Sequence, residues 1–510
     1  MKAIKHFFGK LFGRFTITAV VILVQAAWFA VLVMRLRDYA EFLDIVFTGL
    51  SMLLVLFVIY RNDTSAYKLG WILLILIIPI FGALMYLFFG NKRPSRRIRE
   101  KINPVVDAHR DDLKQVYTTS EMQDSRMQRT VDYISEKGPF PAWENTTTKY
   151  YKLGDYAFPD LLEDLKKAEH FIFLEYFVIG RGRMWDAIHE ILVEKAKAGV
   201  DVRLIYDDVG SMGRVPIGFP GRMEEEGIKT VVFNPLRPIL SLVYNNRDHR
   251  KICVIDGYIA HSGGYNLADE YINEYERFGH WKDSGIRIEG EAVWNFTVTF
   301  LDMWNAFRPT EGDYSRFKPH VFHPDAFDSD GIVQPFSDSP LDEETLGENI
   351  YLEIVNQAED YVYIFTPYLI LNNEMLSCLR LAAKRGVDVR IVAPKIPDKK
   401  IVFRVTRSYY RPLIEDGVKI YEYTPGFIHS KSFIADGKIG VVGTINLDYR
   451  SLFLHFECGT LLIGSRALGG LREDCEETFE ASNQIELHEI RQGFFGVLID
   501  SFLRVLSPLL

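Results

Sequence analysis

Two stretches of this chain, 180 residues apart, carry the same set of side chains that can take part in catalysis. In each, a lysine follows a histidine by two residues, and an aspartate and an asparagine follow at matched offsets. Imidazole, ammonium and amide groups can together attack, protonate and stabilise a phosphate ester, so the repeated set predicts phosphoryl chemistry without a metal. The two sets are His249, Lys251, Asp256 and Asn266, and His429, Lys431, Asp436 and Asn446.

The spacing within each set predicts a β-hairpin that presents its histidine and lysine on one face. Side chains two apart in a strand point the same way, as His249 and Lys251 do if they lie in one strand. Asp256 and Asp436 each precede a glycine, which predicts a tight turn. Both aspartates belong to the catalytic signature, yet we expect them to serve the hairpin more than the chemistry. A pair of small residues before each asparagine would let a ligand approach the backbone, and the prediction is an anion cradle with a histidine on each side.

A histidine that attacks phosphorus or moves a proton needs its other ring nitrogen held by an acceptor. Asp283 and Glu457 are the candidates, because each follows the asparagine of its copy and precedes a strand-like run. The alternative for both is an ordinary surface ion pair. Along the sequence, no group of histidines, cysteines and carboxylates has the spacing of a metal site, so we expect no metal and no cofactor. The four cysteines lack CxxC spacing and are expected to be buried thiols.

The two signatures lie inside a longer internal repeat. The sequence Gly-Val-Asp-Val-Arg occurs at 199–203 and again at 386–390. Strands alternating with helices predict an α/β fold: two duplicated domains with helix-covered mixed sheets around a pseudo-twofold active site. The predicted strand–helix–strand units are 170–179, 185–198 and 200–206, then 361–365, 374–384 and 387–392.

The N-terminal part predicts transmembrane helices. The uncharged runs 15–34 and 69–90 hold 20 and 22 residues, and each can cross a hydrocarbon core of about 30 Å. A shorter run at 42–60 makes the number of spans two or three. The basic cluster after the last run is larger than that before the first, which places the rest of the chain in the cytoplasm.

These patterns divide the chain into five parts. They are a membrane anchor at 1–91, a basic and charged connector at 92–140, a first catalytic domain at 141–330, a second at 331–486 and an amphipathic C-terminal tail at 487–510. The formal net charge of −9 argues against a nucleic-acid partner, because proteins that bind nucleic acid are usually basic.

The repeated signature resembles the HKD motif of the phospholipase D superfamily, over about residues 150 to 490. Longer stretches resemble its bacterial cardiolipin synthases. They are Tyr-Asn-Asn-Arg-Asp-His-Arg-Lys at 244–251, Gly-Gly-Tyr-Asn-Leu-Ala-Asp-Glu-Tyr at 263–271 and Leu-Asp-Tyr-Arg-Ser at 447–451. That family usually has two membrane spans, so a third hydrophobic run is a departure from it.

The resemblance implies a multi-pass enzyme of the bacterial cell membrane that converts two phosphatidylglycerol molecules into cardiolipin and glycerol. It implies phospholipase D-like domains, His249 as nucleophile, His429 as acid and base, and phosphate binding by the two lysines and two asparagines. The symmetry of the motifs leaves the assignment of the two histidines open from sequence alone. Alternatives are a hydrolytic phospholipase D or another phosphatidyltransferase, a membrane-tethered nucleic-acid phosphodiesterase and a non-catalytic scaffold. The sequence does not predict the oligomeric state.

Overall fold

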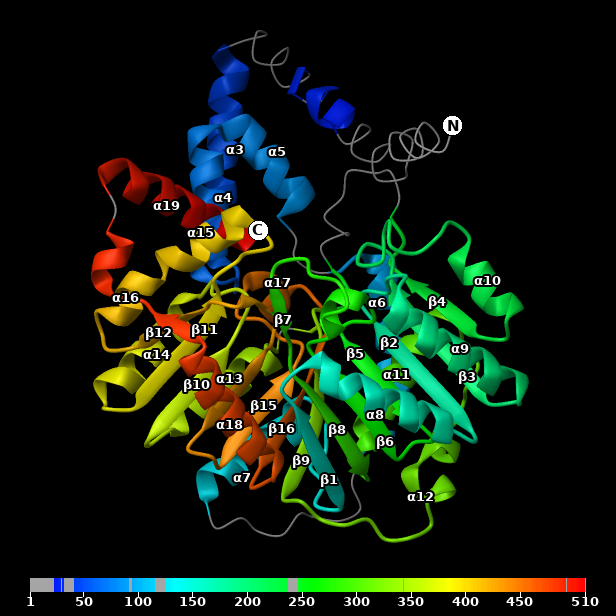
Figure 1. The fold of residues 1–510 in the computed structure, drawn as a ribbon. Coiled ribbons are helices and arrows are strands. Elements are labelled where there is room, and N and C mark those ends of the chain that lie inside the picture. The colour runs from blue at the N-terminus through cyan, green and yellow to red at the C-terminus, as the bar shows by residue number, and fades with distance from the viewer. Residues whose placement is uncertain are drawn as a thin grey trace, which may run out of the picture.

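Two α/β lobes lie side by side, with a smaller group of helices at one end of the molecule (Figure 1). This computed structural model describes residues 23–28, 30–31, 41–90, 94–114, 124–236, 246–342, 344–491 and 493–509. Most of the predicted span 15–34 therefore lies outside the described residues.

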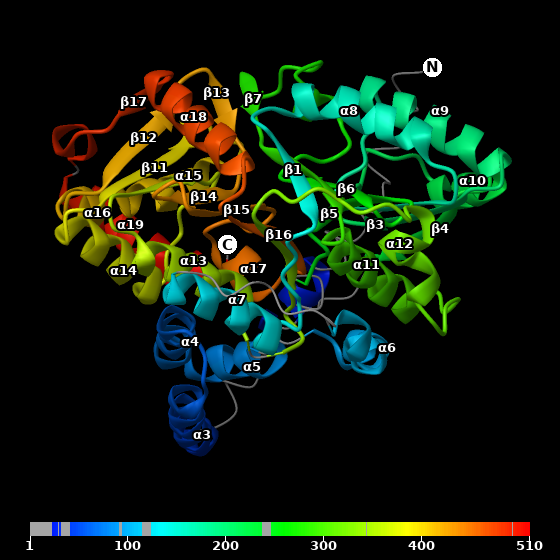
Figure 2. The ribbon, with the colours of Figure 1, turned by 90° about the horizontal axis from the view of Figure 1, so that it is seen from below.

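The first lobe is built on a seven-stranded mixed sheet in the order β1-β8-β6-β5-β2-β3-β4. Along β2, Phe171 and Phe173 pack towards α11, whereas Ile172 and Leu174 pack towards α8 and α9. This alternation explains why the strand is apolar throughout: helices cover both faces of the sheet (Figure 2). The elements are β1 Thr146–Tyr151, α8 Gly154–Lys167, β2 Phe171–Tyr176, α9 Arg183–Lys197, β3 Asp201–Asp207, α10 Phe219–Glu225, β4 Lys229–Phe233, β5 Lys251–Ile255, β6 Ile259–Gly263, β8 Gly285–Gly290, α11 Val293–Phe307 and α12 Pro319–Phe322.

The second lobe repeats this order in an eight-stranded sheet, β17-β12-β11-β10-β14-β15-β16-β9. In both lobes an antiparallel hairpin joins one edge of three parallel strands, and in the second lobe β17 adds an antiparallel strand at the other edge, beside β12. The predicted strand–helix–strand units lie where expected. The elements are β9 Ile332–Asp338, α13 Leu346–Gln357, β10 Tyr361–Phe365, α14 Asn373–Lys384, β11 Asp388–Pro394, α15 Lys400–Ser408, α16 Tyr410–Ile414, β12 Lys419–Tyr423, β14 Ser432–Ala435, β15 Ile439–Gly443, α17 Tyr449–Phe453, β16 Glu457–Ile463, α18 Ala467–Glu480 and β17 Ser482–Gln484.

The two lobes share one hydrophobic core. Ile286 and Ile288 of the first lobe belong to the same buried cluster as Ile434 and Val442 of the second. A two-stranded parallel sheet also crosses the junction, formed by β7 (His280–Lys282) and β13 (Gly426–Ile428). Residues near this junction are therefore held by both halves of the chain.

The N-terminal helices depart from the predicted spans. The run 69–90 is split at Ile78, because Pro79 has no backbone N–H to continue one helix and instead begins the next. Among the residues that the structure describes, none of the helices combines the length and hydropathy that a membrane span requires. The helices are α3 Glu41–Tyr60, α4 Ser65–Ile77 and α5 Pro79–Phe89, and α4 contacts the C-terminal helix α19, Phe494–Leu506.

The connector is less solvated than its charge suggests. Its helix α6 (Arg96–His109) buries Ile98 and Ile102, and the helix contacts α11 of the first lobe. Helix α7 (Ser125–Lys137) buries one side in the same way and contacts α13 of the second lobe. Short 3-10 turns complete the fold at Arg110–Leu113, Asp269–Ile272, Ser315–Phe317, Leu487–Ile490 and Ser507–Leu509.

Candidate active site

Both signature histidines lie where the lobes meet. His249 lies two residues before the start of β5, and its backbone N–H donates to the carbonyl of Phe456 in the second lobe at 2.9 Å. His429 lies between β13 and β14, and its N–H donates to the carbonyl of Lys282 in the first lobe at 2.7 Å. The two side chains are largely buried. Each histidine is thus fixed by backbone from the opposite lobe.

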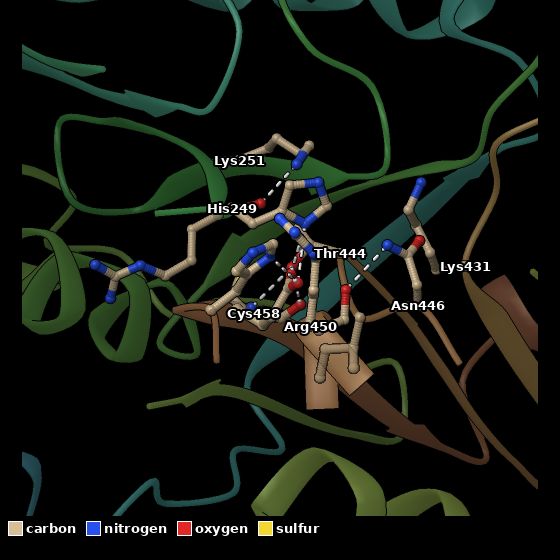
Figure 3. Close-up of polar contacts among 12 residues, drawn as sticks. His249, Lys251, Lys431, Thr444, Asn446, Arg450 and Cys458 are labelled. Carbon is tan, nitrogen blue, oxygen red and sulfur yellow. Dashed lines mark hydrogen bonds and ion pairs between the residues drawn. The ribbon is translucent and has the colours of Figure 1, made fainter. Parts of the chain in front are cut away.

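The carboxylates that hold the imidazoles are exchanged in the same way. Nδ1 of His249 lies 2.9 Å from both oxygens of Glu457, which belongs to the second lobe (Figure 3). Nδ1 of His429 lies 2.6 Å from Oδ2 of Asp283, which belongs to the first. A carboxylate accepts, so each Nδ1 carries the proton and each Nε2 keeps a lone pair for chemistry.

The two lysines place positive charge beside the imidazoles. Nζ of Lys251 donates to the backbone carbonyl of His249 at 2.6 Å, and Lys431 makes the equivalent contact with the carbonyl of His429. Nζ of Lys431 also lies 2.8 Å from Nδ1 of His429, but that nitrogen donates to Asp283, so the carbonyl is the acceptor for the lysine. Both ammonium groups are almost completely buried.

Burial shifts the pKa values of the two histidines, the two lysines and Asp283. It lowers the pKa of Lys251 to about 8 and that of Lys431 to about 7. It also lowers the pKa of both histidines well below 6.5, and the neighbouring lysine charges add to the effect. Burial raises the pKa of Asp283 to about 7 against the pull of the two lysines. The two lysines therefore favour the binding of an anion, whose charge would stabilise their protonated forms.

The two asparagines are anchored locally. Oδ1 of Asn266 accepts from the backbone N–H of Val178 at 3.0 Å, and its Nδ2 donates to the hydroxyl of Tyr271 at 2.8 Å. Nδ2 of Asn446 donates to Oγ of Ser451 at 2.9 Å. An amide nitrogen carries two hydrogens, so each asparagine retains one further N–H for a substrate oxygen.

The two signature aspartates lie at the far end of their hairpins from the histidines. The carboxylate of Asp256 accepts three backbone N–H groups, those of residues 169–171, at 2.7–2.8 Å. Asp436 does the same for residues 359–361. Both have a left-handed backbone, with φ of +49° and +53°. These hydrogen bonds fix each hairpin turn to the start of the neighbouring strand, which is β2 in the first lobe and β10 in the second.

The small-residue pairs have a purpose that the sequence did not reveal. A Cβ added at Gly264 would lie 2.0 Å from Oδ1 of Asp283, so the glycine makes room for the carboxylate that holds His429. At the equivalent position, the hydroxyl of Thr444 donates to Glu457. Space that we expected for a ligand is occupied by the histidine-orienting carboxylates.

A third imidazole was missed by the sequence analysis. The ring centroid of His455 lies 5.7 Å from that of His249, and its Nδ1 lies 3.7 Å from Glu457. Its position two residues before Glu457 was the available signal, since alternate residues of a strand share a face. Because His249 and His455 come from different lobes, their proximity could not be read from spacing along the chain.

The comparisons with known proteins agree with this geometry. A family described as "Cardiolipin synthase, PLD-like domain" matches residues 161–304 and 351–481, and one described as "Phospholipase_D-nuclease N-terminal" matches 49–91. A protein named cardiolipin synthase from Geobacillus sp. is 34% identical, over 90% of this chain and 92% of its own. The chain belongs to the cardiolipin synthase family. The predicted resemblance and phosphatidyltransferase class are thereby confirmed.

Further relatives extend the match over most of the chain. Cardiolipin synthase 1 of Bacillus cereus is 32% identical, covering 92% of this chain and 93% of its own. A Streptococcus mutans protein without an assigned function is 43% identical, covering 89% and 99%. Phosphatidylserine synthase of Haemophilus influenzae shares the fold, with a TM-score of 0.57 at 12% identity, over 76% of this chain and 100% of its own.

The four buried cysteines are free thiols, as expected.

Proposed function

We propose that this member of the cardiolipin synthase family transfers a phosphatidyl group between two phosphatidylglycerol molecules, releasing glycerol and forming cardiolipin. The observation that carries the proposal is the joint site itself. Two histidines, each held by a carboxylate of the opposite lobe, flank two buried lysines at the junction. Relatives 32–34% identical over most of the chain bear the name cardiolipin synthase.

In the proposed first half-reaction, Nε2 of His249 attacks the phosphorus of one phosphatidylglycerol. A P–N bond forms and the P–O bond to the glycerol headgroup breaks. The bound phosphate anion favours the doubly protonated form of His429, which gives its Nε2 proton to the departing glycerol oxygen and is left neutral, with Nδ1 still donating to Asp283. Glu457 stabilises the positive charge that develops on His249, because its two oxygens face Nδ1 of that ring.

In the second half-reaction, a hydroxyl of another phosphatidylglycerol gives its proton to His429 and attacks the phosphohistidine. The P–N bond breaks, which regenerates neutral His249 and yields cardiolipin. Lys251, Lys431 and one N–H from each asparagine stabilise the non-bridging oxygens in both steps. All charge stabilisation in this scheme comes from side chains of the chain itself.

The assignment of nucleophile and acid–base roles is tested by trapping. With a lipid that carries an activated leaving group, His429→Ala should still form a covalent phosphatidyl-enzyme that turns over slowly. His249→Ala should form none. If only the His249→Ala variant becomes labelled, the two histidines exchange roles.

We also propose that the protein works at a bilayer surface, with its catalytic lobes on the cytoplasmic side. The C-terminal helix α19 exposes Phe494, Phe495 and Phe502 on one side. The helix contacts both α4 and α15 and lies at the same end of the molecule as α3–α5 (Figure 1). An apolar helix face continuous with N-terminal hydrophobic helices suits the interfacial region of a membrane.

A hydrolytic phospholipase D is the second candidate, because the same residues would serve if water replaced the acceptor alcohol. Incubation of the full-length protein with phosphatidylglycerol vesicles in EDTA, followed by mass spectrometry of the lipids, distinguishes the two. Cardiolipin as the main product supports the transferase. Phosphatidic acid alone identifies a hydrolase, and a strict requirement for added Mg²⁺ or Zn²⁺ contradicts the mechanism.

A further inference from the structure

His455 lies beside the catalytic centre with 11% of its side chain exposed, and its two ring nitrogens are buried. Neither nitrogen has a hydrogen-bond partner within the part of the chain that the structure describes. The closest carboxylate oxygen, on Glu457, lies 3.7 Å from Nδ1, beyond hydrogen-bond distance. A buried polar group left unpaired is destabilising, so a group in this position favours a ligand.

The surroundings of His455 have the composition of a transition-metal site. One ligand atom each from His249, His455 and Glu457 lie within 4.8 Å of one another. Zinc binds nitrogen and carboxylate oxygen at about 2.0–2.2 Å, so closure around an ion needs movement of about 1 Å. Two imidazoles and one carboxylate favour Zn²⁺ over Mg²⁺ or Ca²⁺, which prefer oxygen ligands.

A route for a cation reaches the same histidine. A cavity of about 340 Å³ is lined by His455 together with four carboxylates and the turn between α3 and α4. The only basic side chain among its lining residues, Arg61, is paired with one of these carboxylates, Asp63, at 3.0 Å. The other carboxylates are Asp338, Asp342 and Glu344. Burial raises the pKa of Asp338 to about 8 and that of Asp342 to about 6, so Asp338 adds little to the negative charge that attracts cations to this opening at neutral pH.

We propose that His249, His455 and Glu457 form an inhibitory Zn²⁺ site. Through Nε2 of His249, the ion would occupy the lone pair that attacks phosphorus. Through Nδ1, it would replace the proton, which leaves to solvent, and take the charge of Glu457 that stabilises the phosphohistidine. The first mode blocks formation of the phosphohistidine and the second slows it, so the inhibition rests on the proposed role of His249. The binding of the metal does not rest on it.

The test uses full-length protein, stripped with chelator and assayed in phosphatidylglycerol vesicles at increasing free Zn²⁺. With the activity of each protein in EDTA as its own reference, His455→Gln should raise the Zn²⁺ concentration for half-inhibition at least tenfold. His455→Asn provides a second variant should the glutamine fold poorly. His189→Gln is the matched control, since His189 also contacts a glutamate, Glu226, far from the site; its inhibition should equal that of the wild type.

Cobalt supplies a readout that is independent of catalysis. Co²⁺ added to the wild-type protein should produce visible absorption with one equivalent bound, and His455→Gln should abolish it. Equal Zn²⁺ inhibition of the wild type and His455→Gln, or cobalt spectra unchanged by the substitution, would overturn the proposal. A protein that binds cobalt through His455 yet makes no cardiolipin would instead refute the proposed function alone.

Discussion

Each signature imidazole contacts a carboxylate that the other half of the chain supplies, and the two carboxylates differ. Glu457 faces Nδ1 of His249 with both oxygens, whereas Asp283 faces His429 with one. The longer side chain also accepts from Thr444, where the first copy has only Gly264. The two half-sites are therefore equivalent in plan but distinct in detail, as a nucleophile and an acid–base group would be.

Neutralising either carboxylate should reduce turnover strongly. We expect Glu457→Gln and Asp283→Asn each to lower kcat by roughly 10²–10⁴, because the imidazole loses both its orientation and the stabilisation of its positive charge. Steady-state cardiolipin synthesis measures the effect. Asp164→Asn is the control: it breaks another buried histidine–carboxylate contact, to His261 at 2.8 Å, and should lower the thermal midpoint while leaving kcat of the folded enzyme near wild type. A kcat within threefold of wild type for Glu457→Gln would contradict the assigned role.

The depressed lysine pKa values predict an alkaline loss of lipid binding. In the free enzyme, Lys251 and Lys431 lose their charge as pH rises through about 8 and about 7. Phosphate binding weakens with them, so kcat/KM should fall between pH 7 and pH 9. The bound phosphate raises both pKa values, so kcat should fall less. Lys431→Arg, which stays charged, should shift the fall to higher pH; a kcat/KM that is flat or rising over this range would refute the account.

The hairpins that carry the signatures could be predicted because residues close together in the sequence determine them. Asp-Gly turns and alternating apolar residues predict the hairpins β5–β6 and β14–β15 at their observed places, and the repeated pentapeptide marks the start of β3 and of β11. The exchange of Glu457 and Asp283 between lobes was not predictable, since it depends on how the two sheets dock across β7 and β13. The same is true of His455, whose neighbour lies 206 residues away along the chain. The break at Pro79 was visible in the sequence but was outweighed by the length of the apolar run.

The turn aspartates should matter for folding more than for chemistry. Asp256→Ala removes an acceptor from three backbone N–H groups and places alanine at a positive φ, so we expect a loss of roughly 2–4 kcal/mol in unfolding free energy. Asp256→Asn keeps an acceptor and tolerates the left-handed backbone, and should lose less. Denaturant unfolding measures both, with Asp325→Ala as an exposed control. A kcat reduced a hundredfold in a fully folded Asp256→Asn enzyme would indicate a direct catalytic role instead.

The end of the molecule that carries α3–α5 and α19 governs, in our proposal, which acceptor reaches the phosphohistidine. Water is far more concentrated than any lipid hydroxyl, so a transferase needs its second substrate held close and in orientation. Docking on a bilayer supplies that proximity. The most exposed apolar residues of α19 are Phe494 at 73%, Phe495 at 78% and Phe502 at 63%.

Replacing these three phenylalanines with serine should weaken binding to phosphatidylglycerol vesicles at least tenfold, because each ring contributes about 1.5–3 kcal/mol when buried. The product should shift from cardiolipin towards phosphatidic acid, while the catalytic residues remain intact. Vesicle sedimentation and lipid mass spectrometry provide the two measurements. The control is a variant with serine at three other exposed positions, all on the first lobe: Tyr156, Tyr275 and Val321. An unchanged product ratio with weakened binding would separate acceptor choice from membrane docking.

The reciprocal backbone contacts, His249 to Phe456 and His429 to Lys282, carry an evolutionary consequence. An interface in which each half completes the site of the other is what two identical subunits related by a twofold axis would form. Joining such subunits in one chain frees the copies from having to remain identical, so mutations can specialise one half without altering the other. Gly264 opposite Thr444, and Asp283 opposite Glu457, are differences of that kind. If the ancestry is a fused dimer, lobes expressed as separate chains should reassemble an active enzyme, and restoring identical residues in both copies should leave a folded protein that has lost its division of labour.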